Sequence, residues 1–343
     1  MPLKSYFQIH KGELSPRYLI SHRIPGGIDS NAAGILALDD LFKIHNKLVQ
    51  PFNENPNPEI PGYSPSDEIS LLELKAIIAR KMLDKCSICE NRCHVNRNEG
   101  KRGKCRVGAK SMYVSEFLHF GEEPELVPSH TVFFTGCTFE CIFCQNWDIA
   151  HGDAAESDAG FRADINLAMK IVEKANYAKN LNLVGGNPDQ HIASILELLI
   201  LLASFKYKRP IVWNSNLYMT PEALMLLSGV ADVHLADFKY GSNECGREYS
   251  GVKNYWDFIT RNLLAVNSVS DILIRHLVLP GHVECCTSNI TKWVAENLPD
   301  AQFNLMFQYR PEYKALNHPV IGRYLTESEK SLARKLASDA GLI

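Results

Sequence analysis

Three cysteines, Cys137, Cys141 and Cys144, form a Cys-x3-Cys-x2-Cys pattern on one short segment. Three thiolates on so compact a loop can bind three corners of a cubane iron–sulfur cluster and leave its fourth iron without a protein ligand. An open iron is comparable to the open position of a catalytic zinc site, because an exchangeable ligand binds there. Structural zinc needs four closed ligands, and the nearest candidate for a fourth is His151. The spacing therefore favours a cluster with an open iron over structural zinc.

A second group, Cys86, Cys89, Cys93 and Cys105, has the pattern Cys-x2-Cys-x3-Cys-x11-Cys. Four sulfurs make a closed shell, which is typical of a structural tetrahedral metal or an electron-relay centre. Zinc and a single iron fit the spacing equally, and a second iron–sulfur cluster is the third alternative. We expect zinc or mononuclear iron here, with unliganded cysteines as the non-metal alternative. A role in folding is also expected, because residues 86–128 have little apolar core of their own.

The last three cysteines, Cys245, Cys285 and Cys286, receive no site assignment from the sequence. Cys285 and Cys286 are adjacent and cannot both face one side of a strand, so we expect core or surface thiols. The ten cysteines are only about 3% of the chain, far below the level of about 8–10% that marks a disulfide scaffold. The tight clusters therefore indicate metal ligation rather than disulfide bridges.

Regular elements that can position these residues begin at Thr131. Six apolar, often β-branched runs are predicted as strands, at 131–135, 181–184, 210–214, 233–238, 272–279 and 303–308. Amphipathic segments are predicted as helices near 164–178, 190–204, 221–229, 255–267, 288–297 and 326–340. Parallel strands with helical crossovers imply an α/β sheet or barrel whose chemistry lies at the carboxyl ends of the strands. Because a full barrel needs eight such units, six predict an α/β fold with a partial (β/α)6 TIM-type barrel.

The N-terminal part is predicted to be an extension of this barrel. A stripe of apolar residues predicts a helix over 31–49, and a proline-rich connector follows over 51–65. Ser66 is the expected cap of a second helix over 69–83, and 112–118 is predicted as a short strand. The expected division is a helical extension with its linker (1–85), a small four-cysteine metal-binding subdomain (86–128) and the barrel (129–343).

Composition excludes several classes of protein. Of the 343 residues, 45% are hydrophobic and 22% are charged, which is ordinary for a globular chain. The formal net charge of −3 provides no basic field for nucleic acid or an anionic membrane. The longest apolar stretch is shorter than the about 18–20 residues that span a bilayer, and the start of the chain lacks the apolar core of a secretory signal. We therefore expect a cytoplasmic protein that binds neither nucleic acid nor membrane.

The cysteine loop resembles the signature of the radical S-adenosylmethionine (SAM) enzymes. Its flanks resemble, in order, segments of the pyruvate formate-lyase activating enzyme-like branch, which carries an extra N-terminal four-cysteine motif. The segments are TVFFTGCTFECIFCQNWDIA, LVGGNPDQHI, IVWNSN, VHLADFKYG, ILIRHLVLPGH and NLMFQYRPEYKA. The resemblance covers roughly 86–325 and leaves the substrate open.

The resemblance implies roles for the loop residues. In that superfamily the amino and carboxylate groups of SAM chelate the open iron, and an electron from the reduced 4Fe-4S cluster cleaves the sulfonium to give a 5′-deoxyadenosyl radical. By resemblance, Cys137, Cys141 and Cys144 are the cluster ligands, and Phe143 matches an aromatic position beside the adenine. The protein then positions SAM, delivers the electron and excludes water and oxygen.

Two strand ends resemble segments that contact SAM. Gly185, Gly186 and Asn187 resemble a Gly-Gly-acidic segment that holds the SAM amino group, with Asn187 in the acidic position. Asn214 and Ser215 resemble a polar segment that faces SAM, and Asn214 again replaces an acidic residue. An amide oxygen still accepts a hydrogen bond from an ammonium group, but without the charge the contact should be weaker.

Charged residues on two further strands are also candidate SAM contacts. Asp237 and Lys239 alternate on the fourth strand and resemble an Asp-x-Lys of the activating enzymes, with a structural ion pair as the alternative. Arg275 lies inside an apolar run, where it either faces the lumen and binds a carboxylate or lies at the mouth of the strand. The activating enzymes place a SAM-contacting histidine near Tyr309, and this chain does not.

Together these features predict a radical SAM enzyme, an oxidoreductase like the activating enzymes, that abstracts hydrogen from a glycyl-radical enzyme or another protein. A radical SAM enzyme that modifies a small molecule is the first alternative, favoured by Asn187, Asn214 and the N-terminal extension. A non-enzymatic iron–sulfur carrier is the second alternative, and the open three-ligand site argues against it. The expected cofactors are a 4Fe-4S cluster, SAM and a second metal. The expected electron donor is a flavodoxin or ferredoxin.

Overall fold

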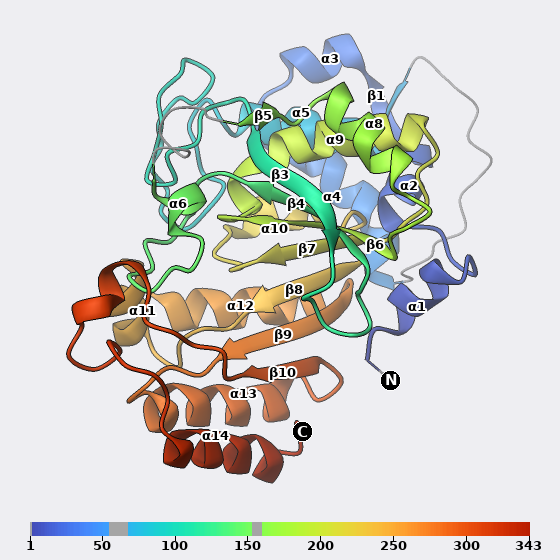
Figure 1. The fold of residues 1–343 in the computed structure, drawn as a ribbon. Coiled ribbons are helices and arrows are strands. Elements are labelled where there is room, and N and C mark those ends of the chain that lie inside the picture. The colour runs from blue at the N-terminus through green and yellow to red at the C-terminus, as the bar shows by residue number, and fades with distance from the viewer. Residues whose placement is uncertain (1, 55–67, 153–159) are drawn as a thin grey trace.

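Eight strands form one sheet at the centre of the computed structural model, which describes residues 2–54, 68–152 and 160–343. The strand order is β10-β9-β8-β7-β6-β4-β3-β5 (Figure 1). Six of the strands pair in parallel: β4 (Ser129–Phe134), β6 (Asn180–Gly185), β7 (Ile211–Ser215), β8 (Val233–Asp237), β9 (Asp271–Leu277) and β10 (Gln302–Met306). They coincide with the six predicted runs, so the prediction of an α/β fold with a parallel sheet is confirmed.

Two antiparallel strands extend the sheet beyond β4. β3 (Met112–His119) pairs with β4, and β5 (Phe161–Arg162) pairs with the start of β3. The predicted short strand over 112–118 is therefore confirmed, although the sequence does not predict that it joins the main sheet.

Side chains of the parallel strands alternate between two faces of the sheet. On the face that we call the inner face, Val212, Leu235 and Leu273 pack with Tyr6 and Leu126 in a buried cluster of their own. Two positions further toward the carboxyl end of each strand, the side chains on this face are polar: Asn214 on β7, Asp237 on β8 and Arg275 on β9. Helix α1 (Lys4–His10) thus covers the apolar part of the inner face, and a polar part is left toward the carboxyl ends.

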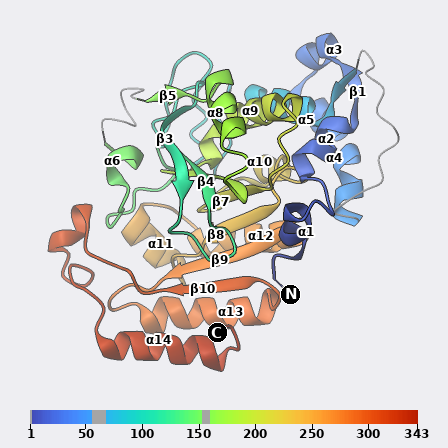
Figure 2. The same ribbon diagram turned by 45° about the vertical axis from the view of Figure 1, so that its right-hand side comes forward.

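Helices follow the strands nearly as predicted. They are α8 (Ile165–Glu173), α9 (Ile192–Ser204), α10 (Pro221–Met225), α12 (Tyr255–Asn267), α13 (Ser288–Asn297) and α14 (Glu327–Asp339). Figures 1 and 2 both place α13 and α14 beside β10, at the opposite end of the molecule from α3 and α5. Two short helices, α6 (Trp147–Ala150) and α11 (Asn243–Ser250), are not predicted. Within the described ranges, no helix is both long and apolar enough to cross a membrane.

The N-terminal region differs from the prediction in one helix. The predicted helix over 31–49 is two helices, α3 (Ser30–Ile35) and α4 (Leu38–Glu54), because Leu36 adopts an extended backbone. Ile35, an apolar residue just before this break, is 86% exposed and does not pack in the core. Gly34 lowers helix propensity before the break, and Asp39 and Asp40 favour a new helix start after it.

The second N-terminal helix is confirmed with a different cap. Helix α5 (Leu71–Lys81) begins at a capping box between Ser70 and Glu73. The predicted cap, Ser66, and most of the proline-rich connector lie outside the described residues. Helix α2 (Arg17–Arg23) and the pair β1 (Pro25–Asp29) and β2 (Glu68–Ser70) are not predicted. Helix α5 packs against α4, α2 and α9, so this region lies against the sheet's outer helices.

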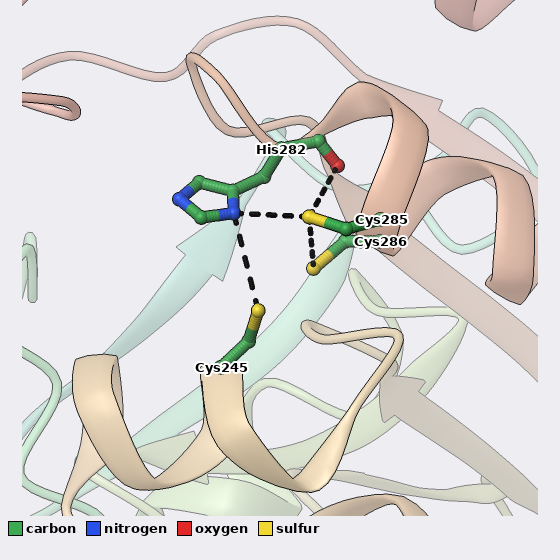
Figure 3. A group of neighbouring side chains, drawn as sticks. All are labelled: Cys245, His282, Cys285 and Cys286. Carbon is green, nitrogen blue, oxygen red and sulfur yellow. Dashed lines mark hydrogen bonds between the residues drawn. The ribbon is translucent and has the colours of Figure 1, made fainter.

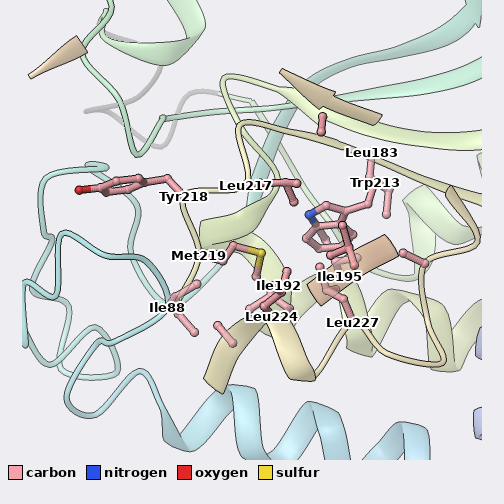
Figure 4. Packing of buried hydrophobic residues seen from close by; sticks show 14 of the residues in the cluster. Ile88, Leu183, Ile192, Ile195, Trp213, Leu217, Tyr218, Met219, Leu224 and Leu227 are labelled. Carbon is pink, nitrogen blue, oxygen red and sulfur yellow. The ribbon is translucent and has the colours of Figure 1, made fainter. Parts of the chain in front are cut away.

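The outer face of the sheet shares one core with the segment that holds the four cysteines. Trp213 of β7 lies among Leu183, Ile195 and Leu227 (Figure 4), and its indole N–H donates to Asp189 Oδ1 at 2.8 Å. Ile88, between Cys86 and Cys89, is fully buried in the same core. The four-cysteine segment is thus anchored to the sheet through apolar contacts.

Candidate active site

A cavity of about 640 Å³ opens at the carboxyl ends of the parallel strands. Sites for small ligands typically have volumes of about 300–1,000 Å³. The lining contains all twelve residues that the sequence assigns to the cluster and to SAM: Cys137, Cys141, Cys144, Phe143, Gly185, Gly186, Asn187, Asn214, Ser215, Asp237, Lys239 and Arg275. Residues that are up to 138 positions apart in the chain are therefore brought to one site.

The three cysteines lie on the loop after β4, residues 135–146, which we call the cysteine loop. Cys137 and Cys141 are buried and Cys144 is half-buried. Burial raises the pKa of all three thiols, to about 12 for Cys144. They therefore stay protonated near neutral pH unless a metal displaces the protons.

Polar groups surround the sulfur atoms of the cysteine loop. The backbone N–H of Phe139 donates to Cys137 Sγ at 3.4 Å. Cys141 Sγ lies 2.9 Å from the hydroxyl oxygen of Ser250, which is 2.6 Å from the hydroxyl oxygen of Tyr240. A thiolate at Cys141 would accept from Ser250, which would accept from Tyr240. Donors of this kind adjust the reduction potential of an iron–sulfur cluster.

The spacing of the sulfur atoms argues against a single ion in the cysteine loop. A tetrahedral zinc–thiolate site, with Zn–S bonds of about 2.3 Å, holds its sulfurs about 3.8 Å apart. Over the described ranges, one group has at least three ligand atoms within 4.8 Å of one another, and it contains none of these three cysteines. His151, the alternative fourth ligand, instead accepts from Arg106 Nη1 at 3.4 Å and is not part of the cavity lining. Thiols at a wider spacing around a cavity fit a polynuclear cluster.

Two glycines bring the end of β6 into direct contact with the end of β4 and with the cysteine loop that follows it. A Cβ on Gly186 would lie 1.9 Å from the carbonyl oxygen of Gly136, and a Cβ on Gly185 would lie 2.2 Å from the backbone nitrogen of Phe134. Gly185 also has a φ of 120°, which disfavours other residues. Only glycine fits at these positions, so the pair fixes the position of the loop.

Asn187 and Asn214, the residues at the acidic positions of the resemblance, are buried at the edge of the cavity. The amide oxygen of Asn187 accepts from the backbone N–H of Asn216 at 3.1 Å, and its amide nitrogen donates to Gln190 Oε1 at 3.1 Å. Asn187 thus already holds the loop after β7. Ser215 Oγ accepts from the backbone N–H of Leu217 at 3.0 Å. Contacts of these residues with SAM stay a prediction.

Asp237 and Lys239 form an ion pair inside the cavity, with 2.7 Å between Lys239 Nζ and Asp237 Oδ2. Burial lowers the pKa of Lys239, but Asp237 and the thiols of Cys141 and Cys144 raise it more, so that it lies above its ordinary value. The lysine thus remains charged beside the cysteine loop. The two residues form an ion pair and also line the cavity, so a structural role and a contact with a ligand are both compatible with their position.

Arg275 faces the cavity and is held by two glutamates that the sequence does not assign to the site. Its guanidinium hydrogen-bonds with Glu122 and, at 2.8 and 2.5 Å, with both carboxylate oxygens of Glu123. Asn304 of β10 donates to Glu123 Oε1 at 2.7 Å. Burial raises the pKa of Glu123, but the hydrogen bonds and charge of Arg275 lower it by more, so the pKa lies below its ordinary value. Arg275 is therefore already paired and is not a free carboxylate receptor.

These glutamates lie on the segment between β3 and β4, which crosses the inner face of the sheet. Leu126 of the same segment belongs to the apolar cluster under the cavity. The only sequence signal for this arrangement is an acidic pair next to Pro124. Asn304 could have been predicted from the sequence. It lies two residues before Met306 on β10, so strand alternation places both side chains on the cavity side of the sheet.

Aromatic residues close one side of the cavity. Phe143 is buried and packs edge-on against Tyr240 and Tyr309, with ring centroids 6.3 and 5.9 Å apart. The hydroxyl of Tyr309 donates to the carbonyl oxygen of Ile321 at 2.6 Å. Tyr309 therefore supports Phe143 and ties the chain after β10 to the site.

The four-cysteine group lies beside the cysteine loop. Cys86, Cys89 and Cys105 are buried, and Cys93 is half-buried. A Cβ on Gly136 would lie 2.4 Å from the carbonyl oxygen of Cys105. As in the cysteine loop, this part of the described chain has no three ligand atoms within 4.8 Å of one another. The group as it stands is wider than the shell of one tetrahedral ion.

Donors and positive charge lie beside the sulfurs of this group. Burial alone raises the pKa of Cys89 and of Cys105 and so favours their protonated thiols. Arg97 Nη1 lies 3.9 Å from Cys86 Sγ, and the backbone N–H of Lys104 donates to Cys93 Sγ at 3.4 Å. Positive charge and N–H donors beside the sulfurs favour thiolates and hence metal binding.

Comparison with known proteins agrees with this geometry. The model of the radical SAM superfamily matches residues 131–294, which run from β4 to α13 and include the cysteine loop. The chain is also 46% identical over 312 residues, 90% of its length, to "Uncharacterized protein MJ0674" of Methanocaldococcus jannaschii, of which it covers 89%. Residues 131–294 therefore form a radical SAM domain, and the chain belongs to the same family as this archaeal protein. A radical SAM domain implies SAM and a 4Fe-4S cluster as cofactors and indicates an enzyme.

Solved structures resemble the chain more distantly. SuiB of Streptococcus suis, also solved with S-adenosylmethionine bound, is 14% identical with a TM-score of 0.44, over 60% of this chain and 44% of SuiB. TYW1 with a lysine-pyruvate adduct is 14% identical with a TM-score of 0.38, over 61% of this chain and 73% of TYW1. This chain thus spans less than half of SuiB.

Proposed function

We propose that this chain is a radical SAM enzyme of the pyruvate formate-lyase activating enzyme-like branch, and that Cys137, Cys141 and Cys144 hold its 4Fe-4S cluster. When bound, such a cluster supplies the electron that cleaves SAM to a 5′-deoxyadenosyl radical, which abstracts a hydrogen atom from the substrate. The sheet, with six parallel strands and polar residues on its inner face, supports the partial (β/α)6 barrel that this proposal requires.

One observation carries the proposal. The three thiols line a single cavity and are not all within 4.8 Å of one another, and no fourth cysteine is among the cavity residues of the described chain. A cluster held by these three thiols would keep one iron without a cysteine ligand, and Gly185, Asn214 and Asp237 would line the space for the ligand of that iron. The residues of the chain hold the loop, orient the ligand and exclude water.

The four-cysteine group is proposed to hold a second metal centre. The sequence favours zinc or a single iron, whereas the wide sulfur spacing supports an iron–sulfur cluster. Contact of Cys105 with Gly136, next to Cys137, supports a role in relaying electrons to the first cluster. Anaerobic reconstitution tests this, because two cubane clusters need about eight iron atoms per chain and one needs about four.

The proposed substrate is a protein, with a small molecule as the alternative. Several large apolar side chains are exposed on the segments beside the cysteine loop: Trp147, Leu316, Val320 and Tyr324. Trp147 stacks on Tyr313 at 5.4 Å between ring centroids, which joins α6 to the segment that follows β10. Exposed apolar side chains that gather at one place are typical of contact surfaces. A flavodoxin or ferredoxin is the proposed electron donor.

The test is anaerobic incubation of reconstituted, reduced protein with SAM. We expect 5′-deoxyadenosine from the wild type and none from Cys141→Ala. Wild-type turnover by Cys141→Ala would overturn the assignment. Deuterium transferred from a candidate protein, or from small molecules of a cell extract, into 5′-deoxyadenosine separates the two substrate classes. A protein that forms no 5′-deoxyadenosine with a full cluster would be a carrier.

A further inference from the structure

Three cysteines and one histidine outside the candidate active site form a compact group. Cys245 lies in the first turns of α11, and His282 ends the loop after β9. Cys285 and Cys286 lie in the short helical turn Val283–Thr287 that precedes α13. Figure 3 shows the three sulfur atoms and the imidazole ring facing one another across α11 and this turn. We propose that Cys245, His282, Cys285 and Cys286, the Cys3His group, bind one zinc ion.

The distances are those of a single tetrahedral ion. With bonds of about 2.3 Å to sulfur and about 2.05 Å to nitrogen, tetrahedral zinc separates two sulfurs by about 3.8 Å and sulfur from nitrogen by about 3.6 Å. Here His282 Nδ1 lies 3.2 Å from Cys285 Sγ and 3.9 Å from Cys245 Sγ, and Cys285 Sγ lies 3.9 Å from Cys286 Sγ. All four ligand atoms are within 4.8 Å of one another. Neither of the other two cysteine groups has this spacing.

The imidazole ring is held in the orientation that a metal needs. His282 Nε2 lies 2.8 Å from the hydroxyl oxygen of Tyr249, whose ring also packs edge-on against the imidazole at 4.8 Å. A metal on Nδ1 places the ring proton on Nε2, which then donates to Tyr249. A histidine ligand fixed through its second nitrogen is a regular feature of protein metal sites.

The helical turn explains how two adjacent cysteines can share one ion. Neighbouring side chains diverge by about 100° on an α-helix, compared with 180° on a strand. Gly241 makes the close packing against this turn feasible, since a Cβ there would lie 2.5 Å from the carbonyl oxygen of Cys285. The sequence predicts separate core or surface thiols because it places Cys285 and Cys286 on a strand. They lie in a helical turn instead, so that prediction has no basis.

The four residues of the Cys3His group are not equally buried, and the exposed one gives an ion access from solvent. Cys245 and Cys286 are buried, His282 is half-buried, and Cys285 is exposed. Zinc therefore reaches the group from the side of Cys285. On binding, the three thiols release three protons to solvent and the imidazole stays neutral, which leaves the site with a net charge of −1.

An ion at this position would brace the cysteine loop. The carbonyl oxygens of Tyr249 and Ser250, at the end of α11, accept from the backbone N–H groups of Ile142 and Glu140 at 3.0 Å. Helix α11 thus holds the cysteine loop at one end and carries Cys245 at the other. Zinc would join this helix to the segment between β9 and α13, more than 30 residues further along the chain.

The first experiment is zinc K-edge X-ray absorption on wild-type protein that was produced with added zinc. We expect the multiple scattering of one imidazole together with sulfur at about 2.3 Å. The four-cysteine group contains no histidine, so a zinc ion bound there would contribute sulfur only. Zinc bound without imidazole, or no zinc bound, would overturn the proposal. The experiment uses no SAM or activity, so its outcome is independent of the proposed function.

Variants then assign the ligands. Zinc per chain should fall by one equivalent in His282→Ala and in Cys245→Ser, and should not change in the control His318→Asn, in which the ring that packs on the other side of Tyr249 is replaced. Equal zinc in folded wild type and ligand variants would contradict the proposal. Non-reducing mass spectrometry of the zinc-free protein provides a second check. A disulfide between two cysteines of the Cys3His group, located by peptide mapping of freshly purified protein, would show that a disulfide rather than zinc occupies the group.

Discussion

The substitution Gly186→Ala adds one methyl group where β6 meets the cysteine loop. The new Cβ would lie 1.9 Å from the carbonyl oxygen of Gly136, 2.8 Å from its carbonyl carbon and 3.2 Å from Cα of Ala150. All three neighbours are backbone atoms, which cannot rotate away as a side-chain end can. Gly186 is not among the glycines with positive φ, so alanine is not strained by its own backbone conformation. The effect of the substitution is therefore steric.

The size of the displacement follows from these distances. Ordinary contacts of a Cβ begin at 3.4 Å, so β6 and the cysteine loop must separate by about 1.5 Å. Gly136 directly precedes Cys137, and the separation therefore moves a proposed cluster ligand relative to the other residues of the cavity. Misplacement of about 1 Å at a reacting centre can cost on the order of 10²-fold in rate. We expect SAM cleavage to fall by about 100-fold, with a loss of about 1–3 kcal/mol in stability from overpacking.

The assay compares iron content and 5′-deoxyadenosine formation after anaerobic reconstitution. The matched control is Gly34→Ala in α3, where a Cβ would meet no atom within 4 Å. This control should keep wild-type activity and gain helix propensity. Thermal unfolding shows whether Gly186→Ala is folded at the assay temperature. If folded Gly186→Ala kept wild-type iron content and cleaved SAM within twofold of the wild-type rate, the contact would not be what positions the loop.

Three further changes test other parts of the site. Cys89→Ala should lower metal content at the four-cysteine group and reduce stability, as measured by metal analysis and thermal unfolding, because the proposed metal would stabilise the fold of residues 86–128. Arg275→Met removes the guanidinium from two largely buried carboxylates and should cost about 3–5 kcal/mol in urea unfolding. Adding Glu123→Gln to it should recover part of the loss. Ser250→Ala removes the hydroxyl beside Cys141 Sγ and so removes a hydrogen bond that would stabilise the reduced cluster. A loss of about 1 kcal/mol corresponds to about 40 mV for one electron. We therefore expect spectroelectrochemical titration to show a midpoint potential lower by tens of millivolts. An unchanged potential would show that this hydroxyl does not donate to the thiolate.

Much of the fold could be predicted from periodicity. The six parallel strands and the helices after them have strong and regular patterns, and their predicted positions are confirmed to within a few residues. The helix over 31–49 was predicted wrongly because a long apolar stripe conceals the extended residue Leu36. Helix α11 is strongly polar, and its pattern gave no sign that its buried residues would face the core.

Some residues of the candidate site could be predicted from the sequence in the same way, and others could not. Residues on the strands and in the turns after them could be assigned, because parallel strands bring their carboxyl ends together at one edge. Glu122 and Glu123 could not be assigned, since they reach the cavity on a segment whose path depends on β3 joining the sheet in antiparallel orientation. The Cys3His group also depends on contact between distant segments, and no local spacing predicts it.

The charges of the cavity give a reason for the two asparagines at positions where the resembling enzymes carry acids. Glu122, Glu123 and Asp237 line the cavity with two basic partners, Arg275 and Lys239, which leaves one carboxylate in excess over arginine and lysine. A buried carboxylate in excess attracts a cation, and SAM, with a sulfonium, an ammonium and a carboxylate group, carries one net positive charge. In the proposed complex with SAM, the negative charge that Asn187 and Asn214 lack would be supplied by Glu122 and Glu123, from the segment before β4. Acidic side chains at Asn187 and Asn214 as well would raise the excess to three and add repulsion that one SAM molecule could not balance.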